Sequence, residues 1–157
     1  DGEGTPTRRI SLIEGGVLTN FLHSEATARA FGVAPTGHAG LGAKVSVGPD
    51  WFVVSTTEGV SSGHDLHHKT HQDPFVLIED LRALHAGVKA SQGSFSLPFD
   101  GWLVKGGERI SVEAATVAGD IRTVLNSLLH LETESEVTPR GVSPHVWVDG
   151  LSITGEA

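Results

Sequence analysis

The sequence predicts a β-rich α+β fold: a single domain over residues 1–157, with a mixed or antiparallel sheet and about two helices. Short apolar, β-branched runs recur along the chain between glycine-rich turns, and only two segments combine capping residues with helical spacing. With 157 residues, of which 38% are hydrophobic, the chain can bury a core without disulfides or a structural metal.

The N-terminal part is expected to contain one hairpin followed by one short helix. Residues 9–14 and 17–22 are apolar-rich runs on either side of Gly15-Gly16, and a two-glycine turn between such runs is typical of a β-hairpin. Ser24 offers a side-chain oxygen for a helix N-cap, and Gly32 is a natural residue just after a helix C-terminus. The spacing therefore predicts a helix that ends before Gly32.

The middle of the chain is expected to be mostly strand. Residues 33–43 are glycine-rich and indicate a loop, whereas residues 44–57 alternate and predict two strands or one interrupted strand. A polar stretch follows, and residues 75–78 are then so continuously apolar that we expect a strand covered on both faces. Further strands are expected over residues 95–97, 101–104 and 109–117.

The C-terminal part is expected to hold the second helix and the last strands. Asp120 can cap a helix, and the apolar residues after it follow the i, i+3, i+4, i+7, i+8 spacing of one helix face. Residues 133–144 are polar and contain prolines, so we expect a link there, followed by terminal strand over residues 146–148 and 151–153. The apolar stripe of the helix consists of Ile121, Val124, Leu125, Leu128 and Leu129.

Composition and charge exclude several classes of protein. Lys and Arg number 11 against 19 Asp and Glu, a formal net charge of -8, so nucleic-acid binding is disfavoured. The chain has no cysteine, which rules out thiol catalysis and cysteine-ligated metal, and no apolar run approaches the length of a membrane span. Because it also has no methionine and begins at Asp1, we expect a piece of a longer protein.

The densest candidate site is a group of histidines between a glycine and a proline. His64-Asp65-x-x-His68 is similar to the zinc-hydrolase pattern H-E-x-x-H, with aspartate as the base and His67 or His71 as a third ligand. Imidazoles three or four residues apart share a helix face and can converge on one cation. The segment has no apolar stripe that would bury a helix, so solvated histidines in a loop are the favoured interpretation.

Four other patterns are interpreted as structural. The glycine-rich segment 36–44 is not a phosphate-binding loop, because Lys44 is one residue late and the order is helix, loop, strand. His85, beside a glycine at a strand end, is expected to be a structural residue. Core or interface packing is expected for Trp51, Trp102 and Trp147. A solvated face is expected for Glu132, Glu134 and Glu136.

Several phrases, taken in order over nearly the whole chain, resemble the C-terminal domain of the TldD/TldE family, whose TldE branch is also called PmbA and which has been labelled "modulator of DNA gyrase". Each phrase is weak alone, and the ordered set is specific. The phrases are Asp1-Gly2-Glu3-Gly4-Thr5-Pro6-Thr7, Leu12-Ile13-Glu14-Gly15-Gly16-Val17-Leu18, Thr27-Ala28-Arg29-Ala30-Phe31-Gly32, Pro35-Thr36-Gly37-His38-Ala39, Gly93-Ser94-Phe95-Ser96, Val117-Ala118-Gly119-Asp120 and Val148-Asp149-Gly150-Leu151-Ser152-Ile153-Thr154-Gly155.

The resemblance implies a cytoplasmic metalloprotease in which a TldD-type subunit supplies zinc and a TldE-type subunit pairs with it around a peptide-cleaving chamber. TldD-type chains are expected to hold the metal with an H-E-x-x-x-H helix and a cysteine that would fall within residues 133–143; this chain has no cysteine there. We therefore expect the TldE/PmbA-type subunit, with no catalytic or metal-binding residue of its own and with peptide-binding residues unassigned. The expected partners are a TldD-type subunit and peptide or unfolded protein, with no nucleic acid and no membrane. A zinc hydrolase built on His64, Asp65 and His68 is the alternative, and a binding module unrelated to peptidases is a third possibility.

Overall fold

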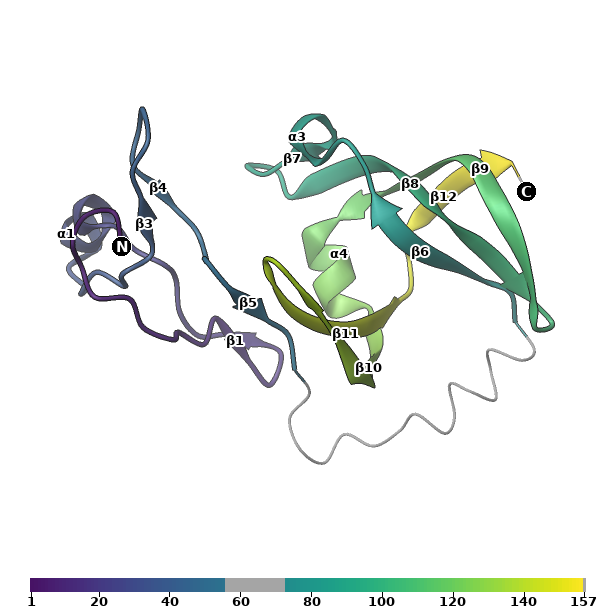
Figure 1. Cartoon of the computed structure of the whole chain (residues 1–157), viewed down its shortest axis with the longest axis horizontal. Helices are drawn as coiled ribbons and strands as arrows, with labels where there is room; N and C mark the ends of the chain where they lie inside the picture. The colour runs from purple at the N-terminus through teal and green to yellow at the C-terminus, as the bar shows by residue number, and fades with distance from the viewer. Residues whose placement is uncertain (56–72, 157) are drawn as a thin grey trace. The chain divides into compact units, whose positions relative to one another are not determined.

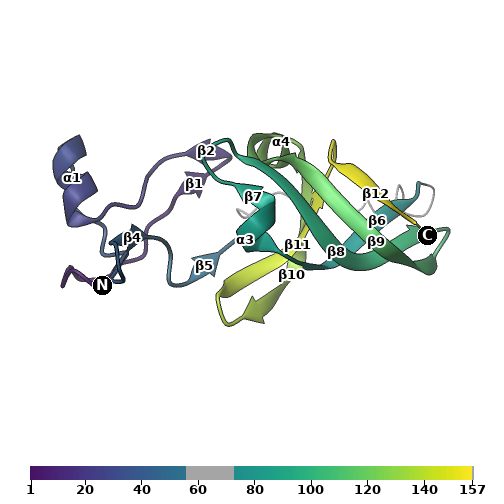
Figure 2. The same cartoon turned by 90° about the horizontal axis from the view of Figure 1, so that it is seen from above.

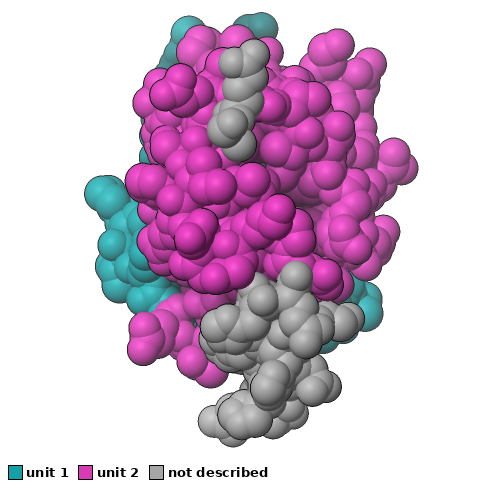
Figure 3. All heavy atoms as spheres, turned by 90° about the vertical axis from the view of Figure 1, so that its right-hand side faces the viewer, with its two compact units in different colours: residues 1–57, 135–143 teal, residues 58–134, 144–157 magenta. Residues whose placement is uncertain are grey.

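A computed structural model of the chain describes residues 1–55 and 73–156. The contacts divide the chain into two compact units, residues 1–57 with 135–143 (unit 1) and residues 58–134 with 144–157 (unit 2), which Figure 3 colours separately. Strands outnumber helices in both units, in agreement with the predicted β-rich α+β class.

Unit 1 contains short strands and one helix. The predicted hairpin is present: Ile13 pairs with Leu18 and Glu14 with Val17, and both turn glycines adopt positive φ values of 56° and 79°. A second antiparallel pair, β3 with β4, places a short strand inside the segment expected to be a loop. The elements are β1 (Ile13–Glu14), β2 (Val17–Leu18), α1 (Glu25–Phe31), β3 (Ala39–Gly40), β4 (Ser46–Val47) and β5 (Phe52–Val53).

Helix α1 has both of the predicted caps. The side chain of Ser24 accepts a hydrogen bond from the Thr27 backbone N–H, and Gly32 ends the helix in the left-handed conformation with φ 66°. The Gly32 N–H donates to the Ala28 carbonyl, which satisfies one of the last helical acceptors.

Unit 2 is organised around an antiparallel sheet with the strand order β12-β9-β8-β6, and β7 also pairs with β8 (Figures 1 and 2). The two long central strands β8 and β9 are joined by a two-glycine turn at Gly106-Gly107, with φ values of 59° and 84°. The elements are β6 (Phe75–Leu81), α3 (Leu84–Gly87), β7 (Val88–Lys89), β8 (Ser94–Lys105), β9 (Glu108–Asp120), α4 (Ile121–Asn126) and β12 (Ser152–Glu156).

The second helix is shorter than predicted, and the expected polar link is a hairpin. Helix α4 ends at Asn126, and Leu128 and Leu129 lie instead in β10 (Leu128–Thr138), which is followed by β11 (Gly141–Val148). The Ser127 carbonyl accepts from the Asp149 N–H, so a contact from distant sequence replaces the next helical hydrogen bond. The helical spacing of these leucines was therefore a misleading signal.

Two shorter segments also differ from expectation. Residues 95–97 and 101–104 belong to one continuous strand, β8, although Pro98 interrupts the apolar pattern. Pro98 lacks an N–H, but its carbonyl still accepts a hydrogen bond from the Arg82 N–H. His85 lies in the unpredicted four-residue helix α3 rather than at a strand end.

Among the described residues, no helix has the length and apolarity needed to cross a bilayer.

The hydrophobic core lies in unit 2, on one face of β8 and β9. Leu97 is directly opposite Val117, and Phe99 is directly opposite Ala115, and all four are 2–4% exposed. Because residues two apart on a strand point to the same face, these two cross-strand pairs form one apolar patch. Val76, Ile78, Phe95, Val112 and Leu151 pack against it.

Register irregularities cross the whole sheet along one line. Glu79 is an extra residue in β6: its neighbours Ile78 and Asp80 pair with the adjacent residues Gly101 and Asp100 of β8. Asp100 in turn faces the two-residue stretch Glu113–Ala114 of β9, where Ala114 has φ 48°. The pairing of β12 with β9 also shifts between Thr154 and Glu156. Aligned bulges of this kind increase local twist and bend a sheet.

Candidate functional site

The interior of unit 1 is held together by hydrogen bonds at its N-terminal turn. One oxygen of the Asp1 carboxylate accepts from the N–H groups of Glu3 and Thr5 at 3.0 and 2.8 Å, and the other accepts from the Ala39 N–H at 3.0 Å. The Gly2 N–H also donates to the Ala39 carbonyl at 2.7 Å. A single carboxylate thus joins two segments that are far apart in the sequence.

A second set of hydrogen bonds fixes the start of α1 in unit 1. The Thr36 hydroxyl accepts from the His23 N–H at 2.8 Å and lies 3.1 Å from the His23 carbonyl, to which it can donate. Thr36 is 5% exposed and the capping residue Ser24 is 3% exposed. Ala28 and Ala39 are the buried hydrophobic residues among the described residues of this unit, so its interior is small and polar.

The glycine-rich segment 36–44 contains β3 and packs closely against the N-terminal residues. Gly37 has φ 75°, and a Cβ atom built on it would lie 2.2 Å from the Pro6 carbonyl oxygen, which is too close for any side chain. The segment is therefore shaped by close packing against the N-terminal residues. Lys44, at its end, is exposed.

Large apolar side chains of unit 1 are exposed. Phe31 is 74% exposed, Leu41 68% and Phe21 65%, although side chains of this size are normally found in a core. Where exposed apolar side chains are contiguous, they are typical of protein interaction sites. We call the following residues the apolar set of unit 1: Ile13, Val17, Leu18, Phe21, Phe31, Val33, Leu41, Val45, Val47, Trp51, Phe52, Val53 and Val137.

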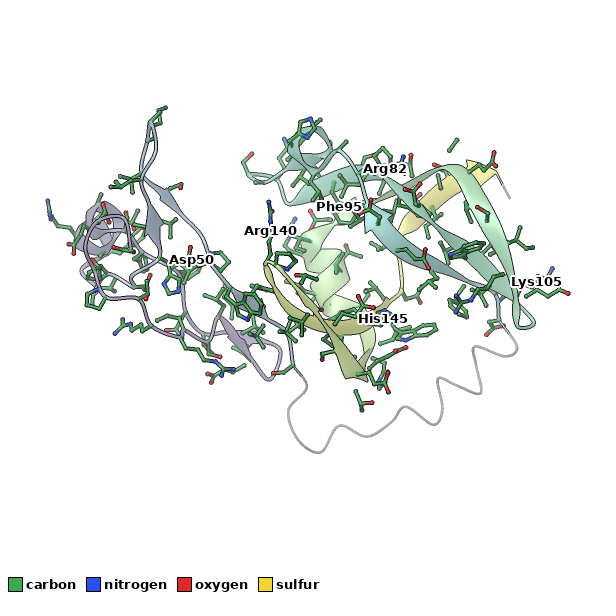
Figure 4. All side chains as sticks on the ribbon, in the orientation of Figure 1. Asp50, Arg82, Phe95, Lys105, Arg140 and His145 are labelled. Carbon is green, nitrogen blue, oxygen red and sulfur yellow. The ribbon has the colours of Figure 1, made fainter. Side chains whose placement is uncertain are left out.

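In unit 2, a carboxylate joins two neighbouring side chains of β11. Glu132 on β10 accepts a hydrogen bond from the Trp147 indole N–H at 2.9 Å, and its other oxygen lies 3.5 Å from His145 Nδ1. The Phe75 ring lies against Trp147, with ring centroids 4.8 Å apart. His145 is labelled on the β10–β11 hairpin in Figure 4.

This arrangement corrects one sequence interpretation and supports another. Glu132 is half-buried and bonded to Trp147, so it is not simply part of a solvated face, whereas Glu134 and Glu136 are exposed. Trp147 and Trp102 are half-buried and pack as expected, whereas Trp51 is 49% exposed. The apolar run at 146–148 indicated the strand that carries Trp147, whereas no sequence signal indicated Glu132 as its partner.

The candidate metal ligands His64, His67, His68 and His71, with Asp65, lie outside the described residues. Within residues 1–55 and 73–156, no three His, Cys, Asp or Glu side chains are grouped so as to hold a metal ion.

The carboxylate of Asp120 is hydrogen-bonded to a neighbouring arginine. It accepts from the Arg122 backbone N–H at 2.8 Å and from Arg122 Nε at 3.2 Å. These two hydrogen bonds, the backbone one first, lower the pKa of Asp120. Asp120 caps α4, so this is a structural carboxylate.

The fold and its surface define a class: a β-rich domain with a compact antiparallel sheet and an exposed apolar surface suited to protein contacts. The family described as "PmbA/TldA metallopeptidase C-terminal domain" matches residues 1–155, and the chain belongs to it.

Relatives and solved structures agree with this assignment. The chain is 27% identical to "Metalloprotease PmbA" of Escherichia coli O157:H7, over 99% of this chain and 32% of the relative. It is 25% identical to the "Metalloprotease PmbA homolog" of Haemophilus influenzae, over 99% of this chain and 32% of that protein. It therefore spans about a third of the length of these relatives.

Two solved structures have the same fold. The structure of a candidate modulator of a DNA gyrase from Thermotoga maritima superposes with a TM-score of 0.75 at 30% identity, over 98% of this chain and 35% of that chain. A candidate modulator of DNA gyrase from Bacteroides thetaiotaomicron has a TM-score of 0.67 at 21% identity, over 99% of this chain and 32% of that one, and supports the fold alone.

Proposed function

We propose that this chain is the C-terminal domain of the accessory, TldE/PmbA-type subunit of a cytoplasmic metalloprotease. In this proposal it pairs with a TldD-type subunit, which holds the zinc, and helps to form the chamber that positions peptides for cleavage. The domain then contributes surface and shape rather than catalytic groups.

The observation that carries the proposal is the apolar set of unit 1. Phe21, Phe31 and Leu41 each expose about two thirds or more of their surface, while the interior beneath them is small and polar. Burial of such side chains is a main favourable term in protein association. A permanent partner surface is the simplest reason for a domain to keep them exposed.

The absence of cysteine supports the accessory role. The chain contains none, and the resemblance places a zinc-binding cysteine of TldD-type chains within residues 133–143. That stretch forms the end of β10, the turn and the start of β11, where Gly141 and Val142 pair in parallel with Phe52 and Val53 of β5. In this chain the stretch supports strand pairing within unit 1.

The test is association of the natural full-length protein with a TldD-type subunit. Phe21→Lys combined with Phe31→Lys should weaken pairing by roughly tenfold or more, because buried aromatic anchors dominate such interfaces. Leu84→Lys combined with Leu125→Lys, at exposed positions in unit 2, gives the same charge change, is the matched control and should leave pairing unchanged. Copurification and analytical ultracentrifugation give the readout.

The same preparations separate the alternatives. If the protein never associates with a TldD-type subunit, or if both variants behave alike, the accessory role is wrong. Stoichiometric zinc on the unpaired protein that is lost in His64→Ala would favour the zinc hydrolase instead. Peptide turnover by the pair that is unaffected when this domain is deleted would favour a binding module with no peptidase link.

A further inference from the structure

Strand β6 forms one edge of the unit 2 sheet. In the strand order β12-β9-β8-β6, it pairs with β8 on one side only, and no described strand lies along its other side. An edge strand of this kind presents unpaired N–H and C=O groups, which can pair with an added strand. Figure 1 shows β6 at this outer position beside β8.

The outer strand has two chemically different halves. Phe75, Val76, Leu77 and Ile78 are apolar and half-buried, whereas the following Glu79 and Asp80 are exposed. Neither of these carboxylates forms an ion pair or a side-chain hydrogen bond with any described residue. The strand therefore carries an apolar half followed by two unpaired negative charges.

The apolar half presents side chains on both faces of the sheet. Val76 and Ile78 pack against the core cluster, whereas the Phe75 ring lies against Trp147. Because alternate side chains of a strand point to opposite faces, a strand added beside β6 would find apolar neighbours on both faces. Backbone pairing with β6 would therefore also bury the apolar residues of the added strand.

We propose that the free edge of β6 binds an extended peptide as an additional strand, with apolar residues beside positions 75–78 and lysine or arginine beside Glu79 and Asp80. The inference rests on the proposed function, since it names the kind of peptide that the accessory subunit guides. Charge complementarity identifies the occupant: unit 2 has six Lys and Arg against thirteen Asp and Glu. Acidic peptides are repelled from the same edge.

The acidic residues have a competing explanation that the test must separate. Charges and bulges at a sheet edge also protect proteins from edge-to-edge association, and Glu79 is both charged and bulged. If protection is their whole role, charge reversal at this edge changes self-association and leaves peptide binding unchanged.

The experiment measures fluorescence anisotropy of a short labelled peptide with a valine–threonine half and a lysine half, made in both orders because an added strand can run either way. A second peptide carries glutamate in place of lysine, and a third has N-methylated backbone groups that cannot pair. The affinity of the natural full-length protein for these peptides is compared with that of the edge variant Glu79→Lys/Asp80→Lys and of the control variant Glu108→Lys/Glu113→Lys. The control reverses two exposed charges away from this edge and changes net charge equally.

The edge variant should bind the lysine peptide roughly five- to tenfold more weakly and the glutamate peptide correspondingly more tightly, as expected for two exposed charge pairs. The control variant should bind both peptides as the unmodified protein does. The N-methylated peptide should not bind any of them. Added salt should reduce the preference for lysine over glutamate.

Two outcomes overturn the inference: no saturable binding of the lysine peptide in either order, or equal effects of the edge and control variants on it. Increased self-association of the edge variant, with unchanged peptide binding, also overturns it and assigns the charges to edge protection. Measuring pairing with the TldD-type subunit in the same samples keeps the hypotheses separate. Normal pairing without charge-dependent peptide binding refutes only this inference, whereas absent pairing refutes the proposed function.

Discussion

The two units of this chain are stabilised in different ways. In unit 2, two cross-strand apolar pairs on long strands form a cluster that is 2–4% exposed. In unit 1, the strands β1 to β5 have two residues each, the hydrogen bonds of Asp1 and Thr36 join its segments, and large apolar side chains are exposed. Unit 2 thus has an apolar core, whereas the buried residues of unit 1 are few and partly polar.

The two units also differ in net charge. Unit 1 has five Lys and Arg against six Asp and Glu and is nearly neutral, whereas unit 2 carries almost all of the net negative charge of the chain. A nearly neutral apolar surface suits lasting contact with protein, and an acidic surface suits attraction of cationic ligands. The comparison teaches that apolar exposure and net charge are distributed separately in this chain, so the two proposals above can be tested by variants in different units.

The largest expected effect is in the core of unit 2. Phe99→Ala should lower the free energy of unfolding by about 3–5 kcal/mol, because it removes a buried ring and leaves a cavity. Phe31→Ala in unit 1, where the ring is 74% exposed, should change it by no more than about 0.5 kcal/mol. Equilibrium denaturation of both variants measures the contrast, and a similar loss in the two would contradict it.

Close backbone packing in unit 1 should give the next effect. Gly37→Ala introduces a Cβ at 2.2 Å from the Pro6 carbonyl oxygen and also strains a positive φ, so we expect a loss of about 2 kcal/mol or more. Gly16→Ala has a similar φ of 79° with open space around it and should cost about 1 kcal/mol. Thermal unfolding monitored by circular dichroism compares them; equal shifts would show that the contact with Pro6 is unimportant.

The hydrogen bonds of unit 1 should contribute less. Thr36→Val removes the hydroxyl that accepts from the His23 N–H and should lower the free energy of unfolding by about 1–2 kcal/mol. Thr36→Ser keeps the hydroxyl and should recover most of this loss. If Thr36→Val and Thr36→Ser are equally destabilising, packing of the Thr36 methyl group rather than its hydrogen bond is responsible. Amide exchange at His23 provides a local readout.

The smallest effect concerns pH and unit 2. Because the folded-state pKa of Asp120 is lowered, its contribution to stability is present above the unfolded pKa and is lost as pH falls through the folded pKa. Asp120→Asn should therefore reduce the dependence of stability on acid pH. The free energy of unfolding is measured as pH falls from above the unfolded-state pKa of Asp120 through its folded-state pKa, with Glu108→Gln as the control. If Asp120→Asn loses as much stability over this range as the unmodified protein, the prediction is wrong.

Local chemistry made the confirmed elements predictable from sequence. Gly15-Gly16 specified its hairpin, and Ser24 and Gly32 specified both ends of α1, because turns and caps depend on residues within a few positions. The C-terminal apolar runs were also recognised as strand, and β6 does contact apolar groups on both faces. The β-rich class followed from these signals.

The errors arose where distant contacts decided the conformation. Leu128 and Leu129 fitted a helix stripe but extend a strand, and the polar residues of β10 carry no apolar alternation that would have indicated a hairpin. The contact between Glu132 and Trp147 depends on that hairpin and could not be predicted without it. The exposure of Phe21 and Phe31 was equally hidden, because side-chain type alone does not show which apolar residues remain uncovered.

The line of bulges across the unit 2 sheet lets neighbouring strands differ in length without changing which side chains face the core. In β6, Ile78 and Leu81 are three positions apart, yet they pair with β8 on the same face of the sheet, because Glu79 is the extra residue between them. Deletion of Glu79 would therefore keep the pairing of β6 and leave Val76 and Ile78 toward the core. Deletion of Leu77, in the regular part of the strand, would instead shift Val76 by one position and turn it away from the core.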